Sequence, residues 1–345
     1  MDPLLLIANS DAGTSEQETL GGALKVLRAH TDVEVCHTSN PGELDGVLHR
    51  AGTRRIVVAG GDGSLHAVVS ALYRRHDLAR STLALIPLGT GNDFARGMGI
   101  PLDPGRAAEL AIHGDVRPLD LIVDELGEVV VNNVHAGASA QASRRGARWK
   151  KRLGALGVGP VNLGKLGYPV GAALAALKPP FVRVRIEVDG EVVADLDHPI
   201  LMVSVGNSSH IGAGTEVTPD ATPEDGTADV MVSFAVGPVS RFTYTIQMKR
   251  GTHQERDDVR HLRGKRVSIC GEQFWCSADG EVYGPERQRT WTVEPGAFRM
   301  ALPPCSADGQ PARPAGGAQA SPGAGPPARS PCSRSWSTLG SPASA

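Results

Sequence analysis

Two glycine-rich segments carry acidic residues where phosphate chemistry would need them. The first, Gly60-Gly61-Asp62-Gly63-Ser64, follows the apolar run 56–59 and precedes a helical pattern over 65–73. Glycines let backbone N–H groups approach an anion closely, and the following helix N-terminus adds a partial positive charge. Asp62 would repel a phosphate unless a divalent cation lay between them, so the segment predicts a phosphate site with Mg²⁺. A purely structural turn with a helix cap is the alternative.

The second segment, Gly89-Thr90-Gly91-Asn92-Asp93, follows the apolar run 83–86. Because adjacent parallel strands end at the same edge of a sheet, the two segments are expected to lie together. Thr90 could donate to a phosphate oxygen, and Asp93 would add a second carboxylate for the metal. For Asn92 a helix cap is the alternative interpretation.

A third acidic pair, Asp279 and Glu281, lies in Ala278-Asp279-Gly280-Glu281, between two strand-like stretches. Phosphoryl transfer to a hydroxyl needs a base to take the proton, and a carboxylate near the apolar Phe274-Trp275 would suit that role. From spacing alone, an Asp-Gly hairpin turn is favoured by about 2 to 1.

The elements that must position these residues fall into two patterns. The first third of the chain alternates short apolar strands with helices, which predicts a doubly wound α/β domain with a parallel sheet over about 1–118. The expected strands are 4–8, 33–35, 56–59 and 83–86, and the expected helices are 19–29, 65–73 and 107–112.

From about residue 119 the chain shows short strands separated by turns, which predicts a β-sandwich-like domain over 119–302. One helix-like stretch, 166–177, interrupts it, and the active site would lie between the two domains. The tail 303–345 is rich in Pro, Ala, Ser and Gly and is predicted to be disordered. The expected strands are 119–123, 128–133, 182–188, 191–196, 200–205, 228–233, 266–269 and 289–294.

Composition excludes several classes of protein. Lys and Arg number 35 and Asp and Glu 37, and a net charge of −2 argues against generic nucleic-acid binding. No apolar run is long enough to span a membrane, and the N-terminus lacks the pattern of a signal peptide. The five cysteines are scattered without metal-ligand spacing, which argues against a disulfide scaffold or zinc finger. We therefore expect a cytoplasmic protein with reduced thiols.

The ordered motifs resemble the catalytic domain shared by diacylglycerol, sphingosine and ceramide kinases, and above all the soluble bacterial diacylglycerol kinases. The resemblance covers most of the folded part and implies an N-terminal domain like that of NAD kinase and phosphofructokinase, with ATP and Mg²⁺ as cofactors. It also implies phosphorylation of a lipid hydroxyl, with diacylglycerol as the expected acceptor. The motifs are GGDGS at 60–64, PLGTGNDFARGMGIP at 87–101, NNVHAG at 132–137, Gly206-Asn207, GAG at 212–214, PDATPEDG at 219–226 and ADGE at 278–281.

The resemblance implies a role for each matched position. Asp62, Asp93 and Asp120 would surround a catalytic Mg²⁺. A second, structural Mg²⁺ would bind the Asp225 side chain and the backbone carbonyls of Thr222 and Thr227. Asp279 or Glu281 would be the general base, a choice that the motif leaves open. The implied ATP-binding positions are Asn9, Gly13, Thr38, Gly60, Gly61, Asp62, Gly63, Ser64, Leu65, His66, Ala67, Gly89, Thr90, Gly91, Asn92 and Asp93.

The chain departs from the family pattern in three places. The first motif, Asn9-Ser10-Asp11-Ala12-Gly13, lacks the usual proline and gains an acid. His66-Ala67 replaces the common Asn-Glu, and His135 and Ser139 stand where glycine and a carboxylate are more usual. These changes keep a catalytically inactive lipid-binding protein open as an alternative. An NAD kinase-like phosphotransferase is a second alternative, although the GTGNDFA and DGE strings argue against it.

A basic cluster predicts contact with a membrane surface. Its members precede a Gly-, Ala- and Leu-rich stretch, 153–177, and this combination suits docking on anionic lipid. A solvated face beside a packed helix is the alternative, at about even odds. The expected partners are a lipid substrate at the membrane surface, met by peripheral contact, and the resemblance also allows a homodimer. The cluster comprises Arg144, Arg145, Arg148, Lys150, Lys151 and Arg152.

Overall fold

The computed structural model describes residues 3–10, 14–140, 181–211 and 214–304. The predicted helix at 166–177, the basic cluster, Gly13 and the tail from 305 lie outside the described residues. Among the described residues, no helix is both long enough and apolar enough to cross a membrane.

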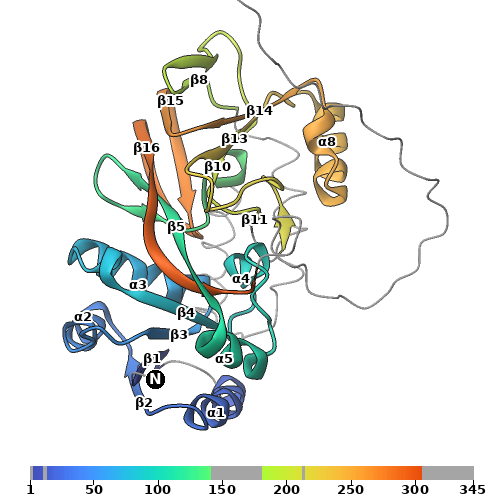
Figure 1. Cartoon of the computed structure of the whole chain (residues 1–345). Helices are drawn as coiled ribbons and strands as arrows, with labels where there is room; N and C mark the ends of the chain where they lie inside the picture. Colours follow the sequence, from blue (N-terminus) through green and yellow to red (C-terminus); the bar gives the residue numbers. More distant parts are fainter. Residues whose placement is uncertain (1–2, 11–13, 141–180, 212–213, 305–345) are drawn as a thin grey trace, which may run out of the picture. The chain divides into compact units, whose positions relative to one another are not determined.

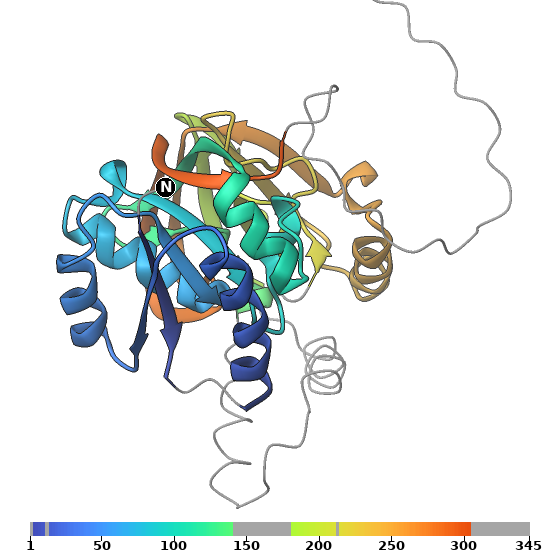
Figure 2. The same cartoon turned by 60° about the horizontal axis from the view of Figure 1, so that its bottom comes forward.

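Four parallel strands form the sheet of the N-terminal lobe, in the order β2-β1-β3-β4 (Figure 1). Side chains on alternate positions of β1 point to opposite faces. Leu5 and Ile7 pack with α2 and α3, whereas Leu4 and Leu6 pack with α1 and α5. Figure 2 shows these helix pairs on the two sides of the strands. The bounds are β1 Leu4–Asn9, α1 Thr14–Arg28, β2 Val33–Thr38, α2 Pro41–His49, β3 Ile56–Gly60, α3 Asp62–Arg74, η1 Leu78–Arg80, β4 Thr82–Pro87, α4 Asp93–Gly97 and α5 Pro104–His113.

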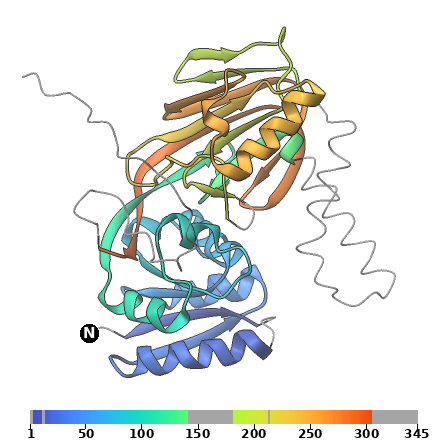
Figure 3. The same ribbon diagram turned by 90° about the vertical axis from the view of Figure 1, so that its right-hand side faces the viewer.

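The C-terminal lobe is built from antiparallel strands in the order β14-β13-β10-β7-β15, with β8 and β9 joined to the first half of β15 (Figure 3). The register of β15 against β16 shifts between Cys270 and Cys276, so its two halves pair with different neighbours. The buried side chains of these strands form one core, most of which is aliphatic. The bounds are β6 Val129–Val130, β7 Asn133–Gly137, β8 Val184–Val188, β9 Glu191–Ala194, β10 Met202–Gly206, β11 His210–Ile211, β12 Thr215–Glu216, β13 Ala228–Ser233, α8 Pro238–Arg250, η2 His253–Glu255, β14 Val259–Gly264 and β15 Arg266–Ala278.

Two long strands connect the lobes. β5 (Asp115–Asp124) pairs with β16 (Glu281–Leu302) along most of its length. The end of β16 then pairs in parallel with β4, through Arg299 and Met300. The doubly wound lobe and the sandwich-like lobe predicted from the sequence are confirmed, and the predicted boundary at 118/119 falls inside β5.

Some elements differ from the sequence expectation. The strand expected over 128–133 is two strands, β6 and β7, and helices α2 and α8 were not expected. Helix α2 contains Gly42 and Gly46, which weaken its helical pattern. Reciprocal capping starts it nonetheless, because Asn40 accepts a hydrogen bond from the Glu43 N–H and the Glu43 carboxylate accepts one from the Ser39 N–H.

Candidate active site

The two glycine-rich loops touch each other at the carboxyl ends of β3 and β4. Gly60 and Pro87 are register partners, so the loops leave the sheet side by side. A Cβ atom added to Gly89 would lie 2.6 Å from the Gly61 Cα, and one added to Gly60 would lie 2.4 Å from the Ser64 Oγ. Gly61 and Gly89 are therefore needed because the two loop backbones approach too closely for side chains there, whereas Gly60 leaves space for the Ser64 side chain.

This close approach gives a prediction for Gly89→Ala. The added methyl group meets backbone, which cannot move aside cheaply, so both loops should shift and the dissociation constant for ATP should rise about tenfold or more. Isothermal titration calorimetry with ATP measures this. The matched control is Gly46→Ala in α2, where a Cβ meets nothing within 4 Å. Equal ATP affinity in Gly89→Ala and parent would contradict the prediction.

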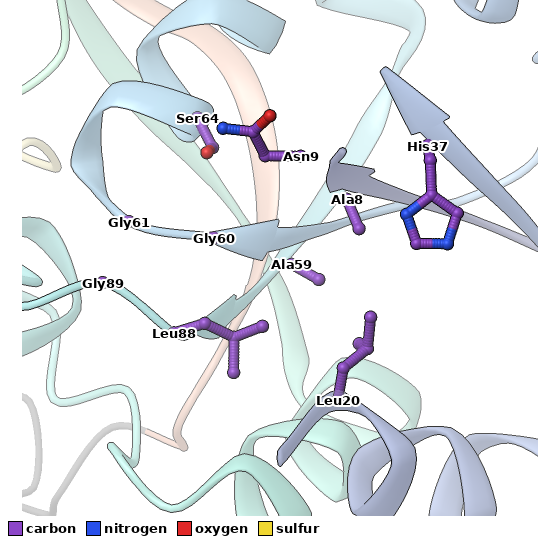
Figure 4. A pocket seen from close by; sticks show the side chains of 10 residues that line it. All are labelled: Ala8, Asn9, Leu20, His37, Ala59, Gly60, Gly61, Ser64, Leu88 and Gly89. Carbon is purple, nitrogen blue, oxygen red and sulfur yellow. The ribbon is translucent and has the colours of Figure 1, made fainter. Parts of the chain in front are cut away.

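A cavity of about 160 Å³ opens beside these loops (Figure 4). It is small for a whole ligand and suits one part of a nucleotide. Asn9 and Ser64 lie along one side of it, and His37, the residue before Thr38, lies at the end of β2. Thr38 does not line the cavity; its carbonyl oxygen accepts a hydrogen bond from the Ser10 N–H, 3.0 Å away. The sequence did not single out His37, Leu20 or Leu88, which also line it.

Asp62 joins the two loops through its carboxylate. One oxygen accepts the backbone N–H of Asp93 at 3.0 Å and the other that of Phe94 at 2.9 Å. The Asn132 side-chain amide from the other lobe lies 3.5 Å from the second oxygen. The oxygen bound by the Asp93 N–H keeps a second lone pair, which could accept a further ligand.

The other predicted ATP-binding residues of the two loops differ in their exposure to solvent. Leu65 is fully buried in the core, so only its backbone could face a ligand, whereas Gly63, Ala67 and Thr90 are exposed. Asn92 has a positive φ of 51°, and its amide N–H donates to the Gly89 carbonyl at 2.7 Å. Its buried Oδ1 has no hydrogen-bond partner among the described residues, which leaves an acceptor oxygen beside the loops.

Asp93 connects the second loop to the C-terminal lobe. Its Oδ1 accepts a hydrogen bond from the Gly214 N–H at 2.8 Å. Gly214 is therefore held against the second glycine-rich loop.

Asp279 lies at the tip of the β15–β16 hairpin and contacts both lobes. Its carboxylate is 1% exposed. It accepts hydrogen bonds from three successive backbone N–H groups, those of Val131, Asn132 and Asn133, at 2.7–3.2 Å. The same carboxylate lies 2.9 Å from the His66 Nδ1 on α3. Both oxygens are thus engaged, and Asp279 fixes the hairpin to both lobes.

Glu281, two residues further on, has a different environment. It begins β16 and is exposed to solvent. It pairs across the turn with Ala278, so its backbone is fixed while its carboxylate remains accessible. Its charge is near enough to help raise the pKa of His66.

His66 and Asp279 form a partly buried ion pair. Burial alone would lower the pKa of His66, but the hydrogen bond and charge of Asp279, with the charges of Glu281 and Glu128, raise it above its usual value. The charged imidazolium is therefore favoured at the hairpin.

The His66 pair predicts a pH dependence of stability. A raised folded-state pKa means that the stabilisation is fully present below about pH 6.5 and is lost as pH rises through the folded pKa. The difference in unfolding free energy between parent and His66→Asn should therefore shrink with increasing pH above that point. Urea unfolding over a pH series measures it, with exposed His198→Asn as control. A difference that stays constant with pH would contradict this assignment.

Asp120 lies against a different turn from Asp62. Its Oδ2 accepts from the Gly226 N–H at 2.6 Å and its Oδ1 from the Gly296 N–H at 2.8 Å. The carboxylate is buried, and its hydrogen bond to Gly226 holds the 222–227 turn.

The same turn contains Thr222, Asp225 and Thr227. Asp225 Oδ1 accepts from the N–H and the hydroxyl of Thr227, at 3.0 and 2.8 Å, and Asp225 Oδ2 lies 3.5 Å from the Arg263 guanidinium. Thus Arg263 already places a positive charge beside the carboxylate expected to bind the second Mg²⁺.

Two of the motif strings in the second lobe link distant parts of the chain by hydrogen bonds. The Asn207 amide donates to the carbonyls of Asp120 and Val131, both at 2.9 Å, and the Ser208 hydroxyl donates to Asn132 Oδ1 at 2.8 Å. His135 is buried in β7, and burial lowers its pKa to about 4, so it is neutral at physiological pH. The sequence identified these strings only through the resemblance, because their contacts lie far apart in the chain.

A doubly wound lobe with two touching phosphate-type loops, facing a carboxylate hairpin from a β-sandwich lobe, defines a phosphotransferase architecture. Residues 3–123 match the family described as diacylglycerol kinase catalytic domain, and residues 132–302 match the YegS C-terminal NAD kinase beta sandwich-like domain. The chain therefore belongs to the family of lipid kinases with a diacylglycerol kinase catalytic domain.

Individual relatives agree with this assignment. A protein of Stenotrophomonas maltophilia named "Probable lipid kinase YegS-like" is 31% identical, over 87% of this chain and 95% of its own length. The diacylglycerol kinase of Bacillus subtilis is 29% identical over 66% of this chain and 71% of its own length. A crystal structure of a diacylglycerol kinase from Bacillus anthracis has a TM-score of 0.67 and 26% identity, covering 88% of this chain and 97% of the other.

Proposed function

We propose that this chain transfers the γ-phosphate of ATP to the hydroxyl group of a membrane lipid, with diacylglycerol as acceptor and phosphatidic acid as product. The N-terminal lobe, about 1–118, would hold ATP, and the C-terminal lobe, about 119–302, would hold the lipid. The observation that carries the proposal is the convergence of three parts: the paired glycine loops, the Asp62 clamp between them and the Asp279–Glu281 hairpin from the other lobe.

The residues at the paired loops suit phosphate and magnesium. Exposed backbone N–H groups near the start of α3 favour an anion. Asp62, Asp93 and the unpartnered Asn92 oxygen are hard oxygen donors of the type that Mg²⁺ prefers. No three acidic, His or Cys side chains gather into a ready-made metal site within the described ranges, which agrees with an ion bound largely by nucleotide phosphates. When bound, Mg²⁺ would neutralise charge that develops on the transferred phosphoryl group.

The accessible carboxylate of Glu281 is the better candidate for the general base. Asp279 already accepts four hydrogen bonds, so a proton would have to displace one of them. In the proposed step, Glu281 takes the proton of the acceptor hydroxyl. The hydroxyl oxygen then forms a bond to the γ-phosphorus, and the bond between the γ-phosphorus and the oxygen that bridges to the β-phosphate breaks to release ADP. Asp279 and His66 would hold the hairpin in position.

The acceptor and the reaction can be tested together. Purified protein is incubated with Mg²⁺ and γ-labelled ATP, either in mixed micelles that contain one lipid each from a panel or with NAD in place of lipid, and products are separated by chromatography. Labelled phosphatidic acid formed from diacylglycerol would support the proposal. Label on a sphingoid base, monoacylglycerol, phosphatidylglycerol or a polyprenol would keep the reaction and change the acceptor. Label on NAD alone, or on nothing while ATP binds, would overturn the proposal.

Because its acceptor lies in a bilayer and ATP is cytoplasmic, the proposed enzyme works at the cytoplasmic membrane surface. That setting makes the outer surface of the C-terminal lobe relevant to its function.

A further inference from the structure

Helix α8 presents two strongly exposed apolar side chains on one face. Val239 is 76% exposed and Phe242 is 68% exposed. With the half-buried Ile246 they follow the spacing i, i+3, i+7, which places all three on the same side of the helix. Lys249 and Arg250 continue that side in the last turn. We call Val239, Phe242, Ile246, Lys249 and Arg250 the α8 face. Figures 1 and 3 show the helix on the outside of the C-terminal lobe.

The opposite side of the helix is packed against the lobe. Tyr244 is almost completely buried in a cluster with Met202 and Met231, whose sulfur atoms its hydroxyl faces at 3.6 and 4.0 Å. This packing fixes the rotation of α8 about its axis, so the exposed apolar side chains cannot turn inward.

A third side of the helix is held by Arg256. Its guanidinium donates to the Ser240 hydroxyl, the Thr243 hydroxyl and the Gln247 side-chain oxygen, at 2.6–2.8 Å. The helix then ends at Gly251, which has a positive φ of 72°. The polar side chains on this side of α8 are therefore hydrogen-bonded to Arg256. These bonds fix the helix, and with it the α8 face, relative to the lobe.

The charge of α8 favours an anionic partner. Among residues 238–250 there are three basic residues and no acidic one. Arg241 lies over the Phe181 ring at 5.6 Å, so its charge is held beside a further exposed aromatic side chain. An apolar strip flanked by basic residues is typical of helices that lie in the interface of a bilayer with anionic lipids.

We propose that the α8 face docks this chain on an anionic bilayer, with Val239 and Phe242 entering the interface and Lys249 and Arg250 contacting headgroups. A stable protein dimer buries about 800 Å² on each partner, and one aromatic side chain supplies only about 150–250 Å². The apolar area of two exposed residues and part of a third is therefore too small for a stable dimer interface but sufficient for peripheral membrane contact. The inference rests on the proposed lipid substrate for its purpose, and its test does not depend on turnover.

The test is sedimentation of the full chain with vesicles of phosphatidylcholine and anionic phosphatidylglycerol, without ATP. Val239→Ser combined with Phe242→Ser should lower the vesicle partition coefficient about tenfold or more. The matched control is Leu126→Ser, a residue 71% exposed in the turn after β5, which should bind like the parent. Thermal unfolding shows that each variant is folded.

A second variant tests the electrostatic part independently. Lys249→Glu with Arg250→Glu should weaken binding to anionic vesicles, and the loss should disappear at high salt. Equal binding of both double variants and the parent would overturn the proposal, as would failure of the parent to bind vesicles. A parent dimer that becomes monomeric in the serine variant, without a change in vesicle binding, would instead assign the face to a second copy of the chain.

Failure of the docking proposal and failure of the proposed function give different results. Phosphorylation of a short-chain diacylglycerol, dispersed as monomers, should stay within about twofold of the parent in the α8 variants, because no bilayer is involved. A parent that phosphorylates no lipid but binds vesicles through α8 would overturn the function and support the surface. A parent that phosphorylates monomeric lipid but binds vesicles independently of α8 would support the function and overturn the docking surface.

Discussion

Replacing Glu281 with glutamine should lower kcat by about 10²–10⁴ while leaving the KM for ATP and for lipid nearly unchanged. The substitution keeps the size of an exposed side chain and removes only its ability to take a proton. The acidic limb of the kcat–pH profile should disappear with it, because that limb reports ionisation of the base. Steady-state kinetics from pH 5 to pH 9 measure both effects.

The companion variant, Asp279→Asn, separates positioning from proton transfer. An amide N–H₂ group would face backbone N–H donors of Val131 to Asn133, so this variant should lose stability together with activity. Glu281→Gln should lose activity alone. A Glu281→Gln rate within about threefold of the parent, with a large loss in a fully stable Asp279→Asn, would assign the base to Asp279.

The second large effect is expected for Asp62. Asp62→Ala removes the acceptor that holds the Asp93 and Phe94 N–H groups and a carboxylate suited to Mg²⁺, so activity should fall to the background of the assay. Asp62→Asn keeps one acceptor oxygen for the loop but lacks the charge. It should therefore be better folded than Asp62→Ala and nearly as inactive.

A matched control for the Asp62 variants is Asp77→Asn, beyond the C-terminal end of α3, whose carboxylate is paired with Arg75 and Arg80. It should retain most of the parent activity. Activity measured over a range of Mg²⁺ concentrations separates a weakened metal site, which excess Mg²⁺ partly rescues, from a displaced loop, which it does not. Full activity of Asp62→Ala would remove this residue from the site.

The glycine loops could be placed from the sequence because their positions depend on local order. Each follows an apolar strand and precedes a helix, and parallel pairing of β3 and β4 then brings them together. Asp279 could not be placed in this way. Its partner His66 is 213 residues distant in the chain, and the three N–H groups that bind it are also far away in sequence, at residues 131–133. Spacing favoured an Asp-Gly hairpin turn there, and only the resemblance favoured a catalytic role for it.

Helix α8 shows a different reason for failure. Its exposed face is partly apolar and its sides carry Ser, Thr and Gln, so the sequence 238–250 has no clear amphipathic pattern. The helix forms because Tyr244 and Arg256 anchor it to the lobe, and such tertiary contacts have no local signal. Asp120 was grouped with Asp62 through the resemblance. Its hydrogen bonds to the backbone N–H groups of Gly226 and Gly296 are long-range contacts that local sequence does not reveal.

The course of β16 has a consequence for how the chain is made. This strand begins at the proposed base, Glu281, and ends beside β4, where Arg299 and Met300 add a strand to the N-terminal lobe. During synthesis the N-terminal lobe leaves the ribosome first, yet β4 gains β16 as its neighbour only when the last part of the fold has been translated. A nascent or truncated chain that ends before residue 281 therefore lacks both the strand beside β4 and the proposed base.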